Sequence, residues 1–180
     1  MSKLLIINGS YREEGNTYRA LMAESNRIVD KYGIEDDTYY FLPEMVACQN
    51  CGGCQKTAKC VIKDDLNGVL SIVERSDRIL IGSPVYLDFP SPKLLAFLSR
   101  CICKAEPTQR EFFRGKKVHL LATAYCSGTK TVIHSLMGAC EMLGFDIEGR
   151  SSKEYVTLWK DLKIRGGMTP QDSAFMPEQK

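Results

Sequence analysis

The chain has 180 residues, of which 44% are hydrophobic and 26% are charged. This length and balance are typical of one globular domain, so two independent domains are not expected. Lys and Arg number 24 against 22 for Asp and Glu, and this near balance argues against nucleic acid or anionic lipid as a partner. No apolar run is as long as a membrane span and no secretory leader is recognisable. We therefore expect a cytoplasmic protein with no membrane partner.

Short apolar runs alternate with amphipathic stretches along the chain. Five runs predict strands, at residues 3–8, 34–42, 78–82, 118–124 and 145–149. Four stretches carry apolar residues at three- and four-residue steps and predict helices, at residues 17–32, 66–73, 91–102 and 132–143. This alternation predicts an α/β fold in which a mostly parallel sheet is covered by helices on both faces.

The loop between the first strand and the first helix spans residues 9–17. Its Ser, Asn and Thr side chains lie next to the open N–H groups of a helix start, where a phosphate is well stabilised. The loop has neither the Lys-Ser/Thr pair of a nucleoside triphosphate site nor the G-x-G-x-x-G of a dinucleotide turn. Helix capping explains the same residue types, but the loop is longer than the roughly 2 to 6 residues typical of such connections. The candidate phosphate-binding residues are Ser10, Arg12, Gly15, Asn16 and Thr17.

A second candidate segment follows the third predicted strand. Ligands of open parallel sheets lie at the carboxyl ends of the strands, where the strand order reverses. Pro84 is expected to form a stiff bend that leaves the following amides free, and Tyr86 is suited to pack on a planar ring. A phosphate at the first loop and a flat ring here describe flavin mononucleotide (FMN), although Tyr86 and Phe89 also suit ordinary loop-to-core anchors. The candidate ring-binding residues of this segment are Pro84, Val85, Tyr86 and Leu87.

Four of the eight cysteines lie close together in the sequence. Three of them, at steps of three with Gly52 and Gly53 between them, can turn their sulfurs toward one centre, and a fourth follows after a short loop. Such a run resembles iron-sulfur ligation, whereas structural zinc sites more often pair two C-x2-C units across a longer span. A thiol-exchange role leaves two cysteines unexplained, and occupancy by a cluster, by zinc or by nothing stays open. The candidate metal ligands are Cys48, Cys51, Cys54 and Cys60.

The other four cysteines favour packing roles. Cys101 and Cys140 fall on apolar faces of predicted helices, as small core residues do. Cys103 and Cys126 are less clearly placed, and Cys126 is also a candidate flavin contact.

Three motifs occur in the order and spacing of a known family. They are G-S-x-R-x-x-G-N-T in the first loop, C-x2-C-x2-C-x5-C-V-I-x-D-D-L in the cysteine segment and G-S-P-V-Y after the third strand. Over residues 3–140 the chain resembles the flavodoxin-fold NADPH-dependent FMN reductases and, among them, the iron-sulfur flavoproteins. The resemblance implies a flavodoxin-like, doubly wound sheet of order 2-1-3-4-5. It also implies a homo-oligomer, a dimer or a tetramer, with FMN near the subunit interface.

The resemblance further implies cofactor contacts in two other places. The loop after the fourth strand should border the flavin ring, and the four clustered cysteines should hold a [4Fe-4S] cluster. This sequence departs from the usual family pattern at Tyr125-Cys126 and at Asp88-Phe89-Pro90. The ring-bordering candidates are Thr123, Ala124, Tyr125, Cys126 and Gly128.

These features predict an FMN-dependent oxidoreductase. FMN would accept a hydride from NAD(P)H, or electrons from a small redox protein, and pass them to a small acceptor, with single electrons moving through a [4Fe-4S] cluster if one is bound. No side chain stands out as catalytic. The alternatives are a cluster-free NAD(P)H-dependent FMN or quinone reductase, a non-enzymatic electron carrier of flavodoxin type, and a thiolate metal-binding interaction module.

We expect a flavodoxin-like FMN-binding domain over residues 1–165 with a cysteine-rich insertion at 46–62, and a tail or oligomerisation arm over 166–180.

Overall fold

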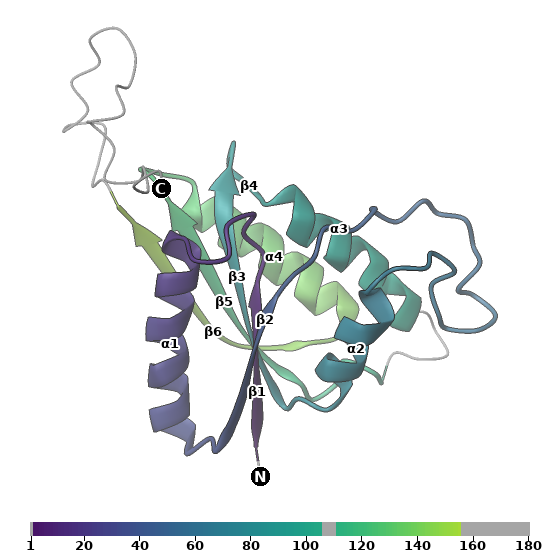
Figure 1. The fold of residues 1–180 in the computed structure, drawn as a ribbon, viewed down its shortest axis with the longest axis horizontal. Coiled ribbons are helices and arrows are strands. Elements are labelled where there is room, and N and C mark those ends of the chain that lie inside the picture. Colours follow the sequence, from purple (N-terminus) through teal and green to yellow (C-terminus); the bar gives the residue numbers. More distant parts are fainter. Residues whose placement is uncertain (1, 106–110, 156–180) are drawn as a thin grey trace, which may run out of the picture.

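A computed structural model of the protein describes residues 2–105 and 111–155. In this part of the chain, parallel strands form a sheet in the order β2-β1-β3-β5-β6, with the short strand β4 off this path (Figure 1). Leaving β4 aside, this is the predicted order 2-1-3-4-5, so the flavodoxin-like α/β fold is confirmed. The strands are β1 Lys3–Asn8, β2 Asp36–Phe41, β3 Arg78–Tyr86, β4 Phe89–Pro90, β5 Lys117–Ala124 and β6 Asp146–Glu154.

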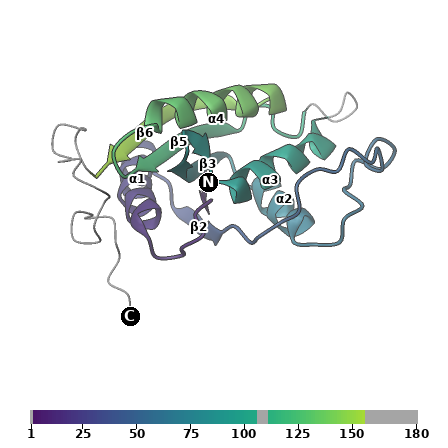
Figure 2. The same cartoon turned by 90° about the horizontal axis from the view of Figure 1, so that it is seen from above.

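Helices cover both faces of this sheet, as the alternating pattern predicts (Figure 2). Successive side chains of a strand point to opposite faces. Leu4 and Ile6 of β1 therefore pack in the smaller core beneath α1, whereas Leu5 and Ile7 pack in the larger core beneath the other helices. The helices are α1 Asn16–Tyr32, α2 Leu66–Glu74, α3 Pro92–Cys101, the 3-10 turn η1 Ile102–Lys104, and α4 Thr129–Leu143.

Local sequence explains several helix ends. The Ser91 side chain accepts a hydrogen bond from the Leu94 N–H at 3.1 Å, and Pro92 occupies the first position of α3. Gly33 and Gly144 follow α1 and α4 in the left-handed conformation that glycine adopts without steric cost.

The strand β3 extends past its predicted end at residue 82 to Tyr86. Pro84 lies inside the strand, in register with Thr123, so the predicted stiff bend at Pro84 is wrong. A proline is tolerated there because the pairing of β1 with β3 ends at Gly82. No carbonyl group of β1 therefore needs a hydrogen bond from the N–H that proline lacks. The chain reverses at Leu87 and enters β4, which pairs with β3 as an antiparallel hairpin.

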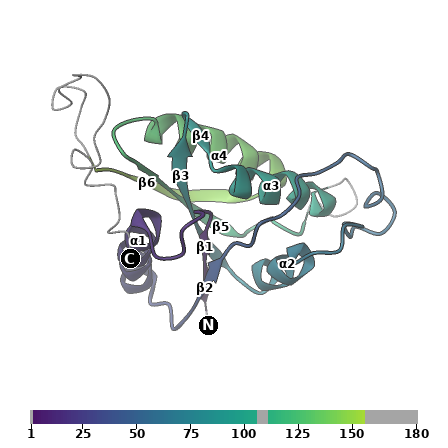
Figure 3. The same cartoon turned by 45° about the horizontal axis from the view of Figure 1, so that its top comes forward.

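The predicted cysteine-rich insertion forms no helix or strand between β2 and α2. This segment extends beyond the end of α3, away from the body of the sheet (Figures 1 and 3). The predicted tail at 166–180 lies outside the described residues. Within the described ranges, none of the helices combines the length and the apolar character needed to cross a membrane.

Candidate functional site

Three loops meet at the carboxyl edge of the sheet, and they follow β1, β3 and β5. The hydroxyl groups of Thr17 and Thr123 lie 2.7 Å apart and join the first loop to the third. The rings of Tyr11 and Tyr86 meet edge to face with centroids 6.1 Å apart and join the first loop to the second. The three loops that the sequence predicts as cofactor loops are therefore neighbours.

The first loop is shaped by its own hydrogen bonds. Asn8, which is fully buried, accepts the Ser10 N–H on its side-chain oxygen at 3.0 Å and donates to the Glu13 carbonyl at 3.1 Å. The Ser10 hydroxyl in turn accepts the Arg12 N–H at 3.0 Å. Arg12 itself is exposed, whereas Ser10 is buried.

The start of α1 is open to a ligand. Its N-cap residue is Gly15, and no side chain caps the helix. The Thr17 hydroxyl is engaged with Thr123, and the Asn16 carbonyl accepts from the Tyr155 hydroxyl at 3.0 Å. Capping alone therefore does not explain the Ser, Asn and Thr residues of the loop, and the first N–H groups of α1 stay available for an anion.

The second loop is the tip of the hairpin between β3 and β4. Tyr86 is 42% exposed and Leu87 is 95% exposed. Burial of the remaining part of the Tyr86 side chain raises the pKa of its hydroxyl. Leu87 and Asp88 both have positive φ values, 49° and 65°, a backbone conformation that costs non-glycine residues energy and clusters at functional sites.

The third loop packs directly against this hairpin. Gly128, the N-cap of α4, has φ 90°, and a Cβ atom added there would collide with Asp88 and Val85. Thr123 and Ala124 are buried at the end of β5, and Tyr125 and Cys126 are half-buried. All the predicted ring-binding residues thus lie at the ends of β3 and β5 or on the two loops that follow them, and these loops are in contact.

Three buried residues support the first loop and were not predicted as part of the site. Ser91 donates its hydroxyl to the Gly9 carbonyl, and its N–H donates to the Ser83 hydroxyl at 2.9 Å. Lys93 donates its ammonium group to the Ser10 carbonyl at 3.0 Å. A lysine in the first turn of a helix opposes the positive end of the helix dipole, and this sequence signal could have marked Lys93 as unusual.

The clustered cysteines do not converge on one centre. Cys48 and Cys51 are exposed, whereas Cys54 and Cys60 are half-buried against the larger core. Across the described ranges, no three His, Cys, Asp or Glu side chains form a group that could hold a metal ion. The donor set has the soft sulfur chemistry that iron-sulfur clusters need, but its arrangement here does not form a metal site, so we derive no step through a cluster.

Cys103, whose position was not clear from the sequence, lies near this segment. It is buried in η1, and burial raises the pKa of its thiol, with nearby Cys54 and Cys60 raising it further. Cys101 and Cys140 are buried in the core, as predicted.

Arg100 anchors the cysteine segment to α3. Its side chain is fully buried, pairs with the Asp64 carboxylate, and donates to the Cys60 sulfur at 3.2 Å. It also donates to the carbonyl groups of Val46 and Ile62. One buried guanidinium therefore fixes both ends of the insertion.

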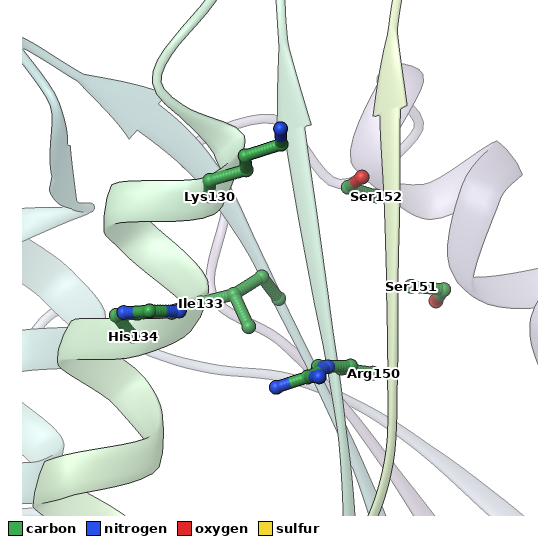
Figure 4. A pocket seen from close by; sticks show the side chains of 6 residues that line it. All are labelled: Lys130, Ile133, His134, Arg150, Ser151 and Ser152. Atoms are coloured by element: carbon green, nitrogen blue, oxygen red, sulfur yellow. The ribbon is translucent and has the colours of Figure 1, made fainter.

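A separate pocket of about 320 Å³ lies between α4 and the edge strand β6 (Figure 4). None of the predicted flavin or metal residues contributes to it. It is lined by Lys130, Ile133, His134, Arg150, Ser151 and Ser152.

The sheet order and the three adjoining loops at its carboxyl edge define a flavodoxin-like protein. Residues 2–148 match the sequence model of the family described as NADPH-dependent FMN reductase. The chain belongs to this family.

Its sequence is similar to proteins named iron-sulfur flavoprotein. It is 34% identical over 99 residues to one from Methanocaldococcus jannaschii, a match that covers 54% of this chain and 51% of that protein. It is 30% identical over 101 residues to one from Methanosarcina thermophila, with 56% and 52% covered. The chain spans about half the length of the curated relatives it matches.

Solved structures share the fold at low identity. The structure of Trp repressor binding protein from Bacillus subtilis has a TM-score of 0.62 and 17% identity, covering 85% of this chain and 88% of that one. RosB with a bound intermediate has a TM-score of 0.65 and 16% identity, covering 87% and 67%. At these identities the likeness shows the fold alone.

Proposed function

We propose that the protein is an FMN-dependent oxidoreductase. The observation that carries this proposal is the meeting of the three predicted cofactor loops at one edge of the sheet, through the Thr17–Thr123 and Tyr11–Tyr86 contacts. Membership of the FMN reductase family supports it. The open start of α1 suits the FMN phosphate, and Tyr86 with residues 123–128 would border the flavin ring.

When bound, FMN supplies the hydride and electron chemistry. The chain's own residues bind and orient it: the N–H groups of loop 9–17 hold the phosphate, and the hairpin and third loop fix the position of the ring. The proposed electron donor is NAD(P)H or a small redox protein, and the proposed acceptor is a small molecule.

The test is direct. Purified protein should release FMN on denaturation and, after reconstitution, should oxidise NADPH or NADH with a quinone or free flavin as acceptor. Failure to bind FMN would overturn the proposal. FMN binding without NAD(P)H oxidation would instead favour the electron-carrier alternative.

The hairpin tip supports a homo-oligomer as part of this proposal. Leu87 and Phe89 are 95% and 62% exposed, beside Tyr11 and Tyr86 at 43% and 42%. A second copy of the chain covering this apolar tip would also enclose the flavin ring. Leu87→Asp should then shift the protein toward the monomer in analytical ultracentrifugation, whereas Met142→Asp, at an 84% exposed position on α4, should not.

We propose separately that Cys48, Cys51, Cys54 and Cys60 ligate an iron-sulfur cluster, which requires this segment to rearrange because the four sulfurs do not converge in the described structure. The names of the curated relatives and the sulfur donor set support this proposal. Iron and sulfide analysis of anaerobically purified protein tests it. Flavin without iron would remove the cluster and leave the FMN proposal intact.

A further inference from the structure

Lys93 is a buried ammonium group at the base of the first loop. Only 4% of the residue is exposed. Its nitrogen donates to the Ser10 carbonyl at 3.0 Å and lies 3.7 Å from the centroid of the Phe41 ring, with the Tyr11 ring further away at 5.6 Å.

This position is electrostatically unfavourable in the unliganded protein. Within the described ranges, Lys93 forms no ion pair with a carboxylate. It also lies in the first turn of α3, where the helix dipole repels a positive charge. Burial lowers the pKa of Lys93, and Glu44 and Glu13 oppose this effect. A buried charge without a counter-ion is costly to keep, and a bound anion at the adjacent loop would offset that cost.

The geometry of the peptide group shows how Lys93 acts on the loop. In a trans peptide the C=O and the following N–H point in opposite directions, and no described peptide bond is cis. Because Lys93 holds the Ser10 carbonyl toward α3, the Tyr11 N–H points away from α3, and it has no acceptor among the described residues. Ser91 holds the Gly9 carbonyl toward α3 in the same way. Two carbonyl dipoles that would repel an anion are thus turned away from the loop's open side.

We propose that Lys93 is a positioning residue that makes loop 9–17 specific for a phosphate group. It orients the Ser10–Tyr11 peptide and places a positive charge without a counter-ion next to that peptide, on the side of α3. This inference rests on the proposed FMN site. It makes the loop select the phosphorylated flavin over riboflavin, which carries the same ring without the phosphate.

The experiment compares FMN and riboflavin binding by the full chain and by Lys93→Met. Methionine keeps a linear apolar side chain and removes both the charge and the hydrogen bond. FMN affinity should fall about 10- to 100-fold, the range expected when a hydrogen bond to a charged group is lost, while riboflavin affinity should change less than about twofold. Lys117→Met is the charge-matched control, since Lys117 pairs with Asp146 at the opposite edge of the sheet, and it should leave both affinities unchanged.

Thermal unfolding without ligand provides a second readout. A lysine with a purely structural role would cost stability when replaced, whereas the proposed role predicts that unliganded Lys93→Met unfolds at the same temperature as the original chain or higher. Equal losses for FMN and riboflavin, or no loss for FMN, would overturn the inference. Failure of the original chain to bind FMN would overturn the proposed function instead, so the two failures are distinguishable.

Discussion

The hydroxyl groups of Thr17 and Thr123 form a buried hydrogen bond of 2.7 Å between the start of α1 and the end of β5. The two residues are 3% and 2% exposed. Because β3 lies between β1 and β5 in the sheet, this bond fixes the spacing of the first and third cofactor loops across the edge of the sheet.

Replacing Thr17 with valine should therefore loosen the site as well as the fold. The change keeps the shape of the side chain and leaves the buried Thr123 hydroxyl without this partner, a defect that costs about 1 to 3 kcal/mol. We expect the free energy of unfolding in urea to fall by that amount and FMN affinity to fall with it. Thr131→Val, at an exposed position of α4, is the control and should change neither. Unaltered stability of Thr17→Val would show that the hydroxyl pair does not hold the loops.

Gly128 offers a sharper test of the contact between the hairpin and the third loop. Alanine at this position would have to adopt φ 90° and would collide with Asp88 and Val85. We expect Gly128→Ala to lower the free energy of unfolding by about 2 kcal/mol or more and to weaken flavin binding.

The matched control is Gly138→Ala, on the same helix. A Cβ atom at Gly138 meets nothing within 4 Å, and alanine in a helix interior is favoured over glycine by about 0.5 to 1 kcal/mol. This variant should gain stability. If both substitutions behave alike, Gly128 is not held in the packed, left-handed conformation described above.

The residue patterns were sufficient to predict a mostly parallel sheet covered by helices on both faces, because alternating apolar runs and helical periodicity are strong in buried elements. The strand order came from the family resemblance. The patterns also brought together the loops after the first and third predicted strands, because ligands of open sheets lie at the carboxyl ends of such strands, and the resemblance added the loop after the fourth. The predicted bend at Pro84 was wrong because β3 continues to pair with β5 beyond the point where its pairing with β1 ends. Residue patterns do not show which of the two neighbouring strands stops pairing first.

The burial of two cationic side chains on α3 was not predicted from the sequence, for a different reason. Lys93 and Arg100 are seven residues apart, so they share one helix face, and each ties a distant loop to α3. A charged residue among apolar helix positions is normally expected in solvent. The partner of Lys93 is Ser10 and that of Arg100 is Asp64, and both partners are identified only when the fold brings them next to α3.

The pair of Asp64 and Arg100 predicts how stability responds to acid. Hydrogen bonding from the Arg100 guanidinium holds the pKa of the Asp64 carboxyl below its usual 3.8. A depressed carboxyl pKa contributes stability that is present above the unfolded value and is lost as the pH falls through the folded value. Asp64→Asn should lower the free energy of unfolding by about 3 kcal/mol at pH 7, because it leaves a buried guanidinium without its counter-ion.

The difference in stability between the unsubstituted chain and Asp64→Asn should become smaller below about pH 4, where the Asp64 carboxylate begins to be protonated as well. Unfolding curves recorded from pH 7 to pH 3 measure it. Asp65→Asn is the control, since Asp65 is exposed and its side chain does not cap α2. Equal behaviour of the two variants would contradict an anchoring role for Asp64.

Lys93 predicts a second rise of stability with pH, at alkaline pH. Because burial lowers the pKa of its ammonium group below 10.5, the unfolded chain binds more protons than the folded chain between the lowered value and 10.5. Stability without ligand should therefore rise with pH across this interval, relative to Lys93→Met. Glu13 and Glu44, the carboxylates that act on Lys93, are present in both proteins, so their own effects cancel in the comparison.

FMN binding should follow the reverse course, since deprotonation removes the charge behind the loop. We expect the advantage of the original chain over Lys93→Met in FMN affinity to shrink over the same interval in which its relative stability grows. Urea unfolding without FMN and fluorescence titration with FMN, both from pH 7 to pH 10.5, measure the two trends. Parallel trends, with affinity and stability rising together, would show that Lys93 acts as an ordinary packing residue and not as a charge held for an anion.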